Sequence, residues 1–235
     1  MKFRDLHKWD LTPKEGVLLQ QELVSQLTIR PLDRPLRFVA GVDISCSKGD
    51  KRLFAAVVVL DIETLEIVEI AEHIEEACFP YVPGLLSFRE IPPLLEAFKK
   101  LNIIPDAVIC DGHGIAHPRG MGLAAHLGLW LQIPTIGCAK KRLIGEYLSP
   151  AIEKGAQTPL VYKKKNVGIV LRTKKNIKPL FISPGHLIDI PGSVILINRC
   201  LNRFRLPEAT RQAHLAVNRL RVETFLSERS ILGLS

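Results

Sequence analysis

The sequence predicts an α/β protein whose mixed central sheet is flanked by helices. Three strand-like segments follow one another in the first third of the chain, and later strand-like segments alternate with helical ones. With 47% hydrophobic residues in 235 positions, the chain can bury a substantial core. These features exclude a disordered chain, and the absence of a repeat or a long linker favours one domain over residues 1–235.

The first third is expected to hold one helix and an antiparallel meander. Thr12 is the predicted N-cap, Pro13 lies in the first turn and Glu15 completes a capping box, so a helix should run through residues 16–27 and end at residues 30–31. Three strands separated by turn residues are then expected at Phe38–Ser45, Arg52–Asp61 and 66–74.

The rest of the chain alternates between strands and helices. After a proline-rich segment at 79–89, we expect a helix at 92–101, a buried strand at 107–111, a helix at Leu123–Leu131 and a short strand at 133–137. This alternation is typical of parallel βα units. A basic stretch at 149–166 is interpreted as a surface insertion, and two strands around a turn at 173–176 and helices near 193–204 and 207–227 complete the chain.

The charged residues indicate what kind of molecule the protein binds. Lys and Arg total 32 against 24 for Asp and Glu, a net charge of +8, and clusters at 163–165, at 174–175 and among the arginines from 199 to 221 indicate basic faces. Such a balance favours a polyanionic partner, although each cluster could equally be a solvated face. The amino terminus lacks a signal-like apolar core and the apolar run at 53–60 is too short to cross a bilayer, so we expect a cytoplasmic protein with no membrane partner.

The cysteines suggest packing roles. Five widely spaced cysteines without a C-x-x-C pair predict small core hydrophobes in a reducing compartment. Cys110 lies beside an acidic residue, but its apolar neighbours favour a buried, inert thiol over a nucleophile.

Three acidic residues, Asp43, Glu90 and Asp111, follow strand-like segments or a proline-rich loop. Two of them end buried strands, where carboxylates converge at the rim of a core. Carboxylates that meet there repel one another, and a divalent cation such as Mg²⁺ relieves the repulsion while activating water and clamping phosphate oxygens. Each Asp alone could instead cap its own turn. Together they suggest a metal-dependent phosphodiesterase.

The motifs around these acids make the comparison specific. Three antiparallel strands followed by αβαβα is the element order of a ribonuclease H-like fold. This chain resembles the endonuclease V family over most of its length, because it carries the motifs of that family in the same order. These motifs are Val39 to Asp43, Pro80 to Gly84 with Phe88 to Glu90, Asp111 to Arg119, Gly137 to Lys140 and Ser183 to Asp189. The resemblance implies a repair nuclease that recognises inosine in nucleic acid and cuts the second phosphodiester bond on its 3′ side, leaving 3′-hydroxyl and 5′-phosphate ends.

The resemblance also implies roles at single positions. Asp43, Glu90 and Asp111 would ligate Mg²⁺, with Mn²⁺ able to substitute. Lys140 would lie near the scissile phosphate and His214 near the metal or the attacking water. The alternative for Lys140 is a solvated helix start beside two other basic residues.

Two loops would bind the substrate. The glycine loop, residues 112–120, contains Gly112, His113, Gly114 and His117; with Gly137 it would hold the extruded nucleotide, since glycines let backbone groups approach a base closely. His113, His117 and His126 could form a zinc site, but the glycines and Pro118 predict a loop where such a site needs a helix.

The second loop is the tyrosine loop, residues 80–84, which comprises Pro80, Tyr81, Val82, Pro83 and Gly84. It resembles the strand-separating element of the family, in which a stiff loop presents an aromatic ring to the gap left by a base. The alternative is an aromatic packed on the surface.

Two other functions stay open. Another ribonuclease H-like nuclease, acting on junctions or hybrids, would share the acids. A catalytically silent nucleic-acid-binding protein would need the basic faces but no carboxylate cluster. We expect a monomer that acts on inosine-containing DNA, with RNA left open.

Overall fold

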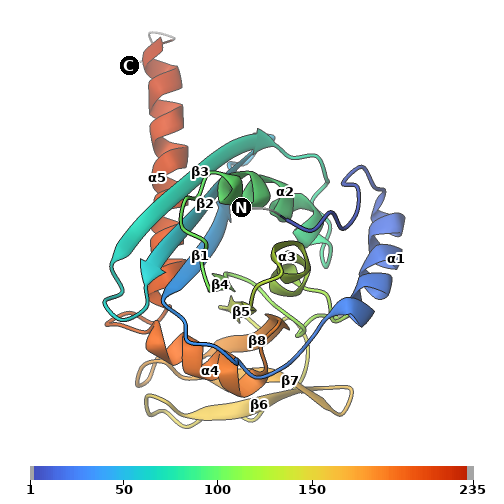
Figure 1. Cartoon of the computed structure of the whole chain (residues 1–235), viewed down its shortest axis with the longest axis vertical. Helices are drawn as coiled ribbons and strands as arrows, with labels where there is room; N and C mark the ends of the chain where they lie inside the picture. Colours follow the sequence, from blue (N-terminus) through green and yellow to red (C-terminus); the bar gives the residue numbers. More distant parts are fainter. Residues whose placement is uncertain (1–2, 232–235) are drawn as a thin grey trace.

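The computed structural model describes residues 3–231, which form one eight-stranded sheet between two layers of helices (Figure 1). The strand order is β3-β2-β1-β4-β5-β8-β7-β6. The strands are β1 (Phe38–Ser45), β2 (Arg52–Asp61), β3 (Ile67–Glu76), β4 (Ala107–Cys110), β5 (Thr135–Ala139), β6 (Gln157–Tyr162), β7 (Lys165–Leu171) and β8 (Leu180–His186). β4 pairs parallel to both β1 and β5, and the other pairs are antiparallel, which confirms the predicted mixed sheet.

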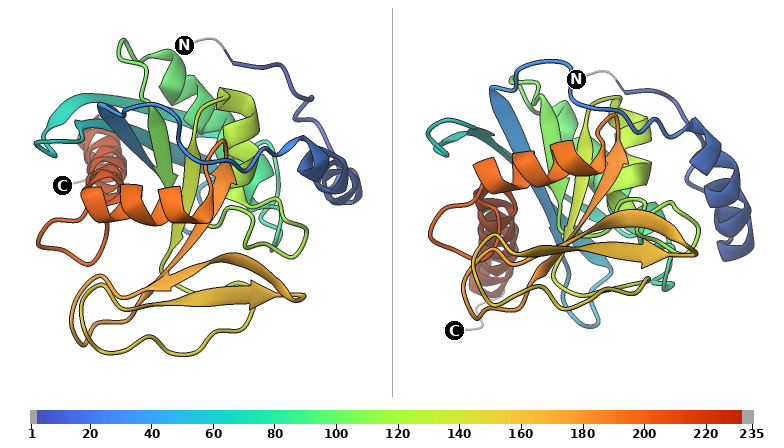
Figure 2. Two further views of the ribbon diagram at one scale, coloured as in Figure 1. Left: turned by 60° about the horizontal axis from the view of Figure 1, so that its bottom comes forward. Right: turned by 90° about the horizontal axis from the view of Figure 1, so that it is seen from below.

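Helices cover both faces of the sheet (Figures 1 and 2). They are α1 (Pro13–Leu23), the short 3₁₀ helix η1 (Val24–Gln26), α2 (Leu86–Lys99), α3 (Leu123–Leu131), α4 (Ile190–Arg199) and α5 (Glu208–Ile231). Strand β2 is buried on both faces: Phe54, Ala56 and Val58 pack with α4 and α5, while Ala55 and Val57 pack with α2 and α3. This explains why its sequence is a continuous apolar run instead of an alternating one.

The amino-terminal segment packs over α3. The predicted capping box is confirmed, because the Thr12 side chain accepts from the Glu15 amide and the Glu15 carboxylate accepts from the Thr12 amide at 2.7 Å. Trp9 stacks on Trp130 with ring centroids 5.0 Å apart. The α-helix ends at Leu23, earlier than expected, because the chain tightens there into η1.

Helix α2 corrects the sequence interpretation. We expected it to begin at Pro92, since proline is common in a first turn, but it begins at Leu86 and continues through Pro92 and Pro93. Phe88, Ile91, Leu94, Leu95 and Phe98 recur at helical spacing and are all buried, so burial of this face outweighs the hydrogen bonds that two prolines cannot make.

The carboxyl-terminal half contains a second correction. The basic stretch at 149–166 is not an insertion, because it supplies β6 and the start of β7, which end the sheet. β6 contains Pro159 and has one fully buried residue, Leu160, so its sequence carries little of the alternation that marks a strand. The pair of strands flanking the turn at 173–176 is confirmed as β7 and β8, and the two final helices are confirmed with α4 starting three residues earlier than expected.

Three cysteines, Cys110, Cys138 and Cys200, are buried as predicted, whereas Cys46 and Cys78 are exposed and do not belong to the core. Burial raises the pKa of the Cys110 thiol far above its ordinary value, so this thiol stays protonated and unreactive. Across residues 3–231, no helix has the length and apolar character needed to cross a membrane.

Candidate active site

Two of the predicted acids lie side by side at the carboxyl ends of neighbouring parallel strands. Val42 of β1 is in register with Cys110 of β4, so the next residues, Asp43 and Asp111, continue the same register. Parallel strands present their carboxyl ends at one edge of a sheet, which is why residues 68 positions apart in the chain meet here. The sheet therefore delivers two carboxylates to one point.

Glu90 reaches the same place from α2. It lies in the second turn of the helix, not at the end of a loop as the sequence suggested, and its side chain is half-buried. Burial, together with the carboxylates of Asp43 and Asp111, raises the pKa of Glu90 to about 8. Burial also raises the pKa of Asp43, and the nearby Asp111 adds to the effect. The three acids therefore share one field of mutual repulsion.

Each aspartate holds a basic partner. His214 of α5 donates from Nδ1 to Asp43 Oδ2 at 2.7 Å, and the Lys140 ammonium forms an ion pair with Asp111. Lys140 directly follows β5, the strand next to β4, so it is not the start of a helix. Asn218, one turn after His214, contacts its ring and also pairs with Ser45 Oγ at 3.2 Å. Sequence reasoning missed Asn218 and Ser45, which carry no motif of their own.

Gly41 allows α5 to come this close. A Cβ atom on Gly41 would lie 2.0 Å from the carbonyl oxygen of Ala209, which is backbone and cannot move aside locally. Gly41 and Asp43 share the face of β1 that α5 covers. The close contact at Gly41 thus sets the height of α5 over the sheet and brings His214 to Asp43.

The donor chemistry of this group fits a hard divalent cation. The described part of the chain contains no group of three His, Cys, Asp or Glu side chains already arranged to hold a metal ion. Lys140 pairs with Asp111 and His214 pairs with Asp43. Three carboxylates are nonetheless the oxygen ligands that Mg²⁺ and Mn²⁺ prefer. The pKa of Glu90 is raised by burial first and by the charges of Asp43 and Asp111 second, and a bound cation would offset both effects.

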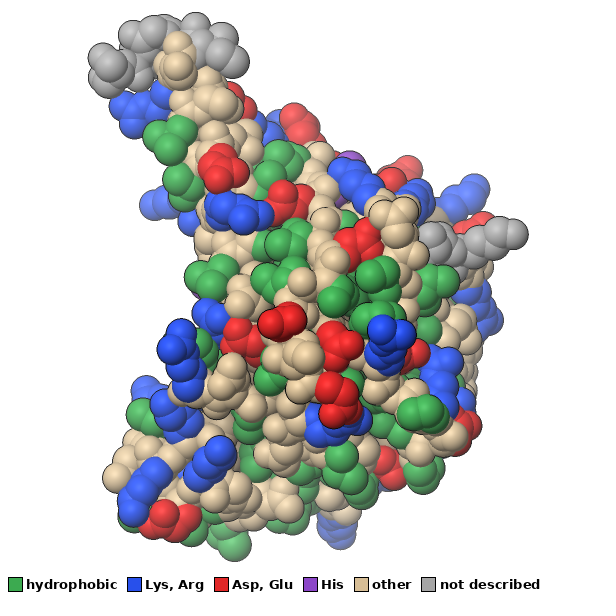
Figure 3. All heavy atoms as spheres, turned by 60° about the vertical axis from the view of Figure 1, so that its left-hand side comes forward, with side chains coloured by type: hydrophobic (Ala, Val, Ile, Leu, Met, Phe, Trp, Pro, Cys, Tyr) green, Lys and Arg blue, Asp and Glu red, His purple; other side chains and the backbone are tan. Residues whose placement is uncertain are grey.

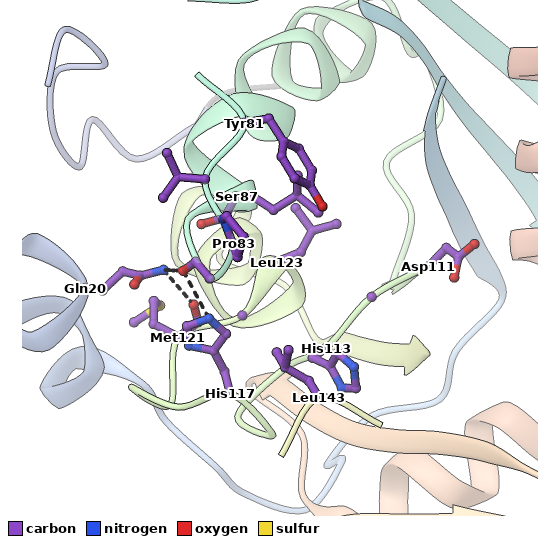
Figure 4. A pocket seen from close by; sticks show the side chains of 15 residues that line it. Gln20, Tyr81, Pro83, Ser87, Asp111, His113, His117, Met121, Leu123 and Leu143 are labelled. Atoms are coloured by element: carbon purple, nitrogen blue, oxygen red, sulfur yellow. Dashed lines mark hydrogen bonds between the residues drawn. The ribbon is translucent and has the colours of Figure 1, made fainter. Parts of the chain in front are cut away.

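A pocket of about 230 Å³ adjoins the carboxylates (Figure 4). Of the predicted substrate-binding residues, it is lined by Tyr81, Pro83, Gly84, Gly112, His113 and His117, and Asp111 stands at its edge. The sequence did not indicate the rest of the lining, which is mostly apolar: Gln20, Val82, Leu86, Ser87, Met121, Gly122, Leu123 and Leu143. His113 Nδ1 is buried and has no hydrogen-bond partner within residues 3–231. The pocket thus has mostly apolar walls, with His113 among its few polar side chains.

The tyrosine loop is fixed to the glycine loop through one carbonyl. Gly84 has a φ of +79°, and its carbonyl oxygen accepts from Gln20 Nε2 and from His117 Nε2, each at 3.1 Å (Figure 4). The same oxygen accepts from Arg119 Nη2 at 2.7 Å. Burial lowers the pKa of His117 to about 4, so the ring is neutral and carries its hydrogen on Nε2. We refer to these three donors as the Gly84 clamp.

The clamp leaves the tip of the tyrosine loop in solvent. Tyr81 is 71% exposed at the mouth of the pocket, and Arg89 donates to the Phe79 carbonyl at 2.8 Å on the other side of the loop. An exposed aromatic ring on an anchored loop can meet a ligand without prior rearrangement.

Three predicted residues do not line the pocket: Pro80, Gly114 and Gly137. A Cβ atom on Gly114 would lie 2.0 Å from the Pro184 carbonyl oxygen, and one on Gly137 would lie 2.4 Å from the Gly114 amide nitrogen. These glycines therefore let the glycine loop pack against β5 and β8.

The three histidines do not form a zinc site. His126 is fully buried on α3, where Nε2 pairs with His7 Nε2 at 2.8 Å and Nδ1 pairs with Ser87 Oγ at 3.0 Å. His117 belongs to the Gly84 clamp. Each of these two rings is thus held by a neighbour other than a metal ligand.

Comparison with known proteins agrees with this geometry. The family model described as Endonuclease V matches residues 21–215. The chain is 48% identical to the Endonuclease V of Thermosipho melanesiensis over 214 residues, covering 91% of this chain and 93% of that protein. The crystal structure of the Bacillus subtilis Endonuclease_V superposes with a TM-score of 0.90 at 34% identity, covering 97% of this chain and all of that one.

A more distant structure carries a ligand. The Ciona intestinalis Endonuclease V, in complex with a 24mer DNA containing an inosine followed by a ribo-adenosine, has a TM-score of 0.79 at 24% identity over 90% of this chain and 98% of that one. At that identity the likeness concerns the fold. These structures confirm the predicted ribonuclease H-like fold.

Proposed function

The chain belongs to the endonuclease V family, and we propose that it cuts inosine-containing DNA at the second phosphodiester bond 3′ to the lesion, leaving 3′-hydroxyl and 5′-phosphate ends. One observation carries the proposal. Asp111 belongs both to the carboxylate group and to the edge of the pocket, so a base held in the pocket has its neighbouring phosphates beside the candidate metal ligands. The function is DNA repair.

The family is metal-dependent, and we assign Mg²⁺ to Asp43, Glu90 and Asp111, with Mn²⁺ as a substitute. When bound, such an ion lowers the pKa of water and stabilises charge on the phosphate. Lys140 is a positive point charge beside Asp111 and is positioned to attract the scissile phosphate. His214 pairs with Asp43 through Nδ1, and we assign its Nε2, which lies 3.2 Å from Asn218 Nδ2, to take a proton from water.

The pocket supports recognition of a single extruded base. Its apolar walls suit the faces of a heterocycle, and the polar side chains among its lining, Gln20, Ser87 and His113, are candidates to contact the edge of the base. Tyr81 at the mouth is suited to fill the space that the base leaves in the stack. Pairing is weakest at a deaminated base, so extrusion costs least there.

Three finer points belong to the same proposal. We propose that the protein acts in the cytoplasm, as a monomer and on DNA in preference to RNA. The basic charge is compatible with either nucleic acid, because both present a phosphate backbone.

Matched oligonucleotides test the proposal. Strands identical except for inosine or adenine at one position, made as DNA and as RNA, are incubated with Mg²⁺, with Mn²⁺ or with chelator. We expect one metal-dependent cut, two phosphodiester bonds 3′ of inosine, with the DNA strand cut faster. Equal cutting of the adenine strand would indicate a general ribonuclease H-like nuclease, and binding without cutting in Mg²⁺ would indicate a silent binding protein.

A further inference from the structure

The hairpin between β6 and β7 has an unusual turn. Tyr162 pairs with Lys165, so the turn consists of two residues, Lys163 and Lys164, whose φ angles are +50° and +64°. A two-residue hairpin turn with both φ angles positive favours Asn-Gly, because only small or locally hydrogen-bonded side chains adopt this conformation readily. Here two lysines hold it. The chain accepts local strain at the tip of the hairpin, and such strain is a reason to look for a function.

Charge at this tip is also left unbalanced. Lys163, Lys164 and Lys165, which we call the hairpin tip, are all exposed. No ion pair joins any of the three to an acidic side chain within residues 3–231. The Lys163 ammonium lies 5.2 Å from the centre of the Tyr162 ring, a contact that holds it in place without neutralising it. Three adjacent cations repel one another unless an anion binds between them.

A short segment links the hairpin tip to the wall of the pocket. Glu146 and Val161 exchange backbone hydrogen bonds of 2.8 and 2.9 Å, and Val161 is the second residue before the turn. Leu143, three residues before Glu146, lines the pocket. Both views in Figure 2 show the turn of the β6–β7 hairpin pointing toward the loops on the side of α1. One short segment therefore connects the pocket wall to the hairpin tip.

Charge elsewhere on the molecule is distributed differently. On the face shown in Figure 3, acidic side chains gather near the centre, and most Lys and Arg side chains lie around them, along the left and right edges and on the projecting end of α5. That acidic centre is unfavourable for a polyanion.

We propose that the hairpin tip binds the sugar–phosphate backbone on one flank of the nucleotide held in the pocket. Lysines act on phosphates as point charges and do not read the base sequence, so the contact anchors the substrate equally whatever base occupies the pocket. The inference rests on the proposed function, since it takes nucleic acid as the ligand.

Salt titration of binding tests the inference. The variant Lys163→Asn with Lys164→Gly removes two charges and installs the residues that this turn favours, so its thermal midpoint should equal or exceed that of the wild type. Binding is measured without divalent metal on duplexes with and without inosine. Loss of two phosphate contacts should weaken binding roughly ten- to a hundredfold at low salt and reduce the slope of log affinity against log salt by about 2, equally for both duplexes.

Two controls separate a local contact from net charge. Lys163→Arg with Lys164→Arg keeps the charges and should bind like the wild type. Lys174→Gln with Lys175→Gln removes two charges beyond the far end of β7 and should change the slope by much less. An unchanged slope in the Asn-Gly variant, or an equal change in the control at 174–175, would overturn the inference. The wild-type preference for inosine, measured on the same duplexes, tests the proposed function separately.

Discussion

At the scale of single residues, Asp43 and Asp111 have equivalent positions but different partners. A histidine holds the first and a lysine holds the second. We predict that Asp43→Ala or Asp111→Ala abolishes cleavage while binding is retained or tightened, because the change removes a metal ligand and also a negative charge near the phosphates. Cleavage under single-turnover conditions and binding without metal are measured on folded protein. Mg²⁺-dependent cutting by either variant would refute the assigned site.

Glu90 gives a prediction on pH dependence. Its pKa of about 8 in the folded protein exceeds the ordinary value of 4.5, so the folded state holds a proton that the unfolded state releases between these values. This group therefore stabilises the metal-free protein fully below about pH 4.5, and the contribution is lost as the pH rises through about 8. Glu90→Gln, which keeps the uncharged shape, should match the wild type near pH 5 and be more stable near pH 9.

Thermal unfolding in chelator measures this difference at each pH, so that other titrating groups cancel between the two proteins. Added Mg²⁺ should stabilise the wild type more at the higher pH, where Glu90 is ionised, and Glu90→Gln less. A constant difference between the two proteins from pH 5 to 9 would show that Glu90 is not held in the repulsive group.

At the scale of elements, the position of α5 depends on Gly41. We predict that Gly41→Ala lowers the free energy of unfolding by about 1–3 kcal/mol, because the added Cβ overlaps the Ala209 carbonyl. Displacement of α5 should also separate His214 from Asp43 and reduce cleavage by about 10²-fold. Gly16→Ala is the matched control, since a Cβ there makes ordinary contacts and favours α1. Wild-type cleavage by Gly41→Ala would mean that α5 adapts without moving His214.

The Gly84 clamp gives a second prediction at this scale. Gln20→Ala removes a buried side chain that donates to the Gly84 and Met121 carbonyls and accepts from Arg119 Nε, so it should cost about 1–3 kcal/mol of stability. It should nevertheless slow cleavage of duplexes more than of single strands, because only a duplex needs a rigid tyrosine loop. Gln21→Ala, on the exposed neighbour in α1, is the control. Equal slowing on both substrates would assign Gln20 to general stability.

The elements also show where sequence reasoning succeeds. β1, β2 and α3 were predicted at their observed bounds, because each is a mostly apolar run that is largely buried. The start of helix α2 was misplaced because proline can begin a helix or interrupt one, and β6 was missed because it is a mostly exposed edge strand that contains Pro159. The local sequence pattern thus predicts the bounds of an element where that element is mostly buried, and fails where exposed positions or prolines obscure the pattern.

At the scale of the whole molecule, the acids were identifiable from sequence and the clamp was not. Asp43 and Asp111 each end a recognisable strand, so the parallel pairing of β1 and β4 follows from the fold. Gln20 meets Gly84 from a helix 64 residues away, and no local pattern marks that contact. Residues that act through tertiary contact alone require the structure.

Changes in the carboxylate group, the pocket and the tyrosine loop should have different effects on the cleavage of duplex and single-stranded substrates. We predict that Tyr81→Ala reduces selectivity for inosine in duplex DNA without disturbing the metal site. The ring is 71% exposed, so its removal leaves no core cavity and should not lower the thermal midpoint. Losing the stacking that fills the vacated position should cost about 1–3 kcal/mol, roughly ten- to a hundredfold in binding.

The defect should shrink on single strands, where the base is already largely unpaired and the ring has less to replace. Asp43→Ala should be inactive on both substrates, because metal chemistry is needed whatever the state of pairing. Single-turnover cleavage of inosine-bearing duplexes and single strands by both variants separates these contributions. Wild-type rates for Tyr81→Ala on both substrates would make Tyr81 a surface residue with no part in recognition. The extrusion of the base would then depend on the pocket alone.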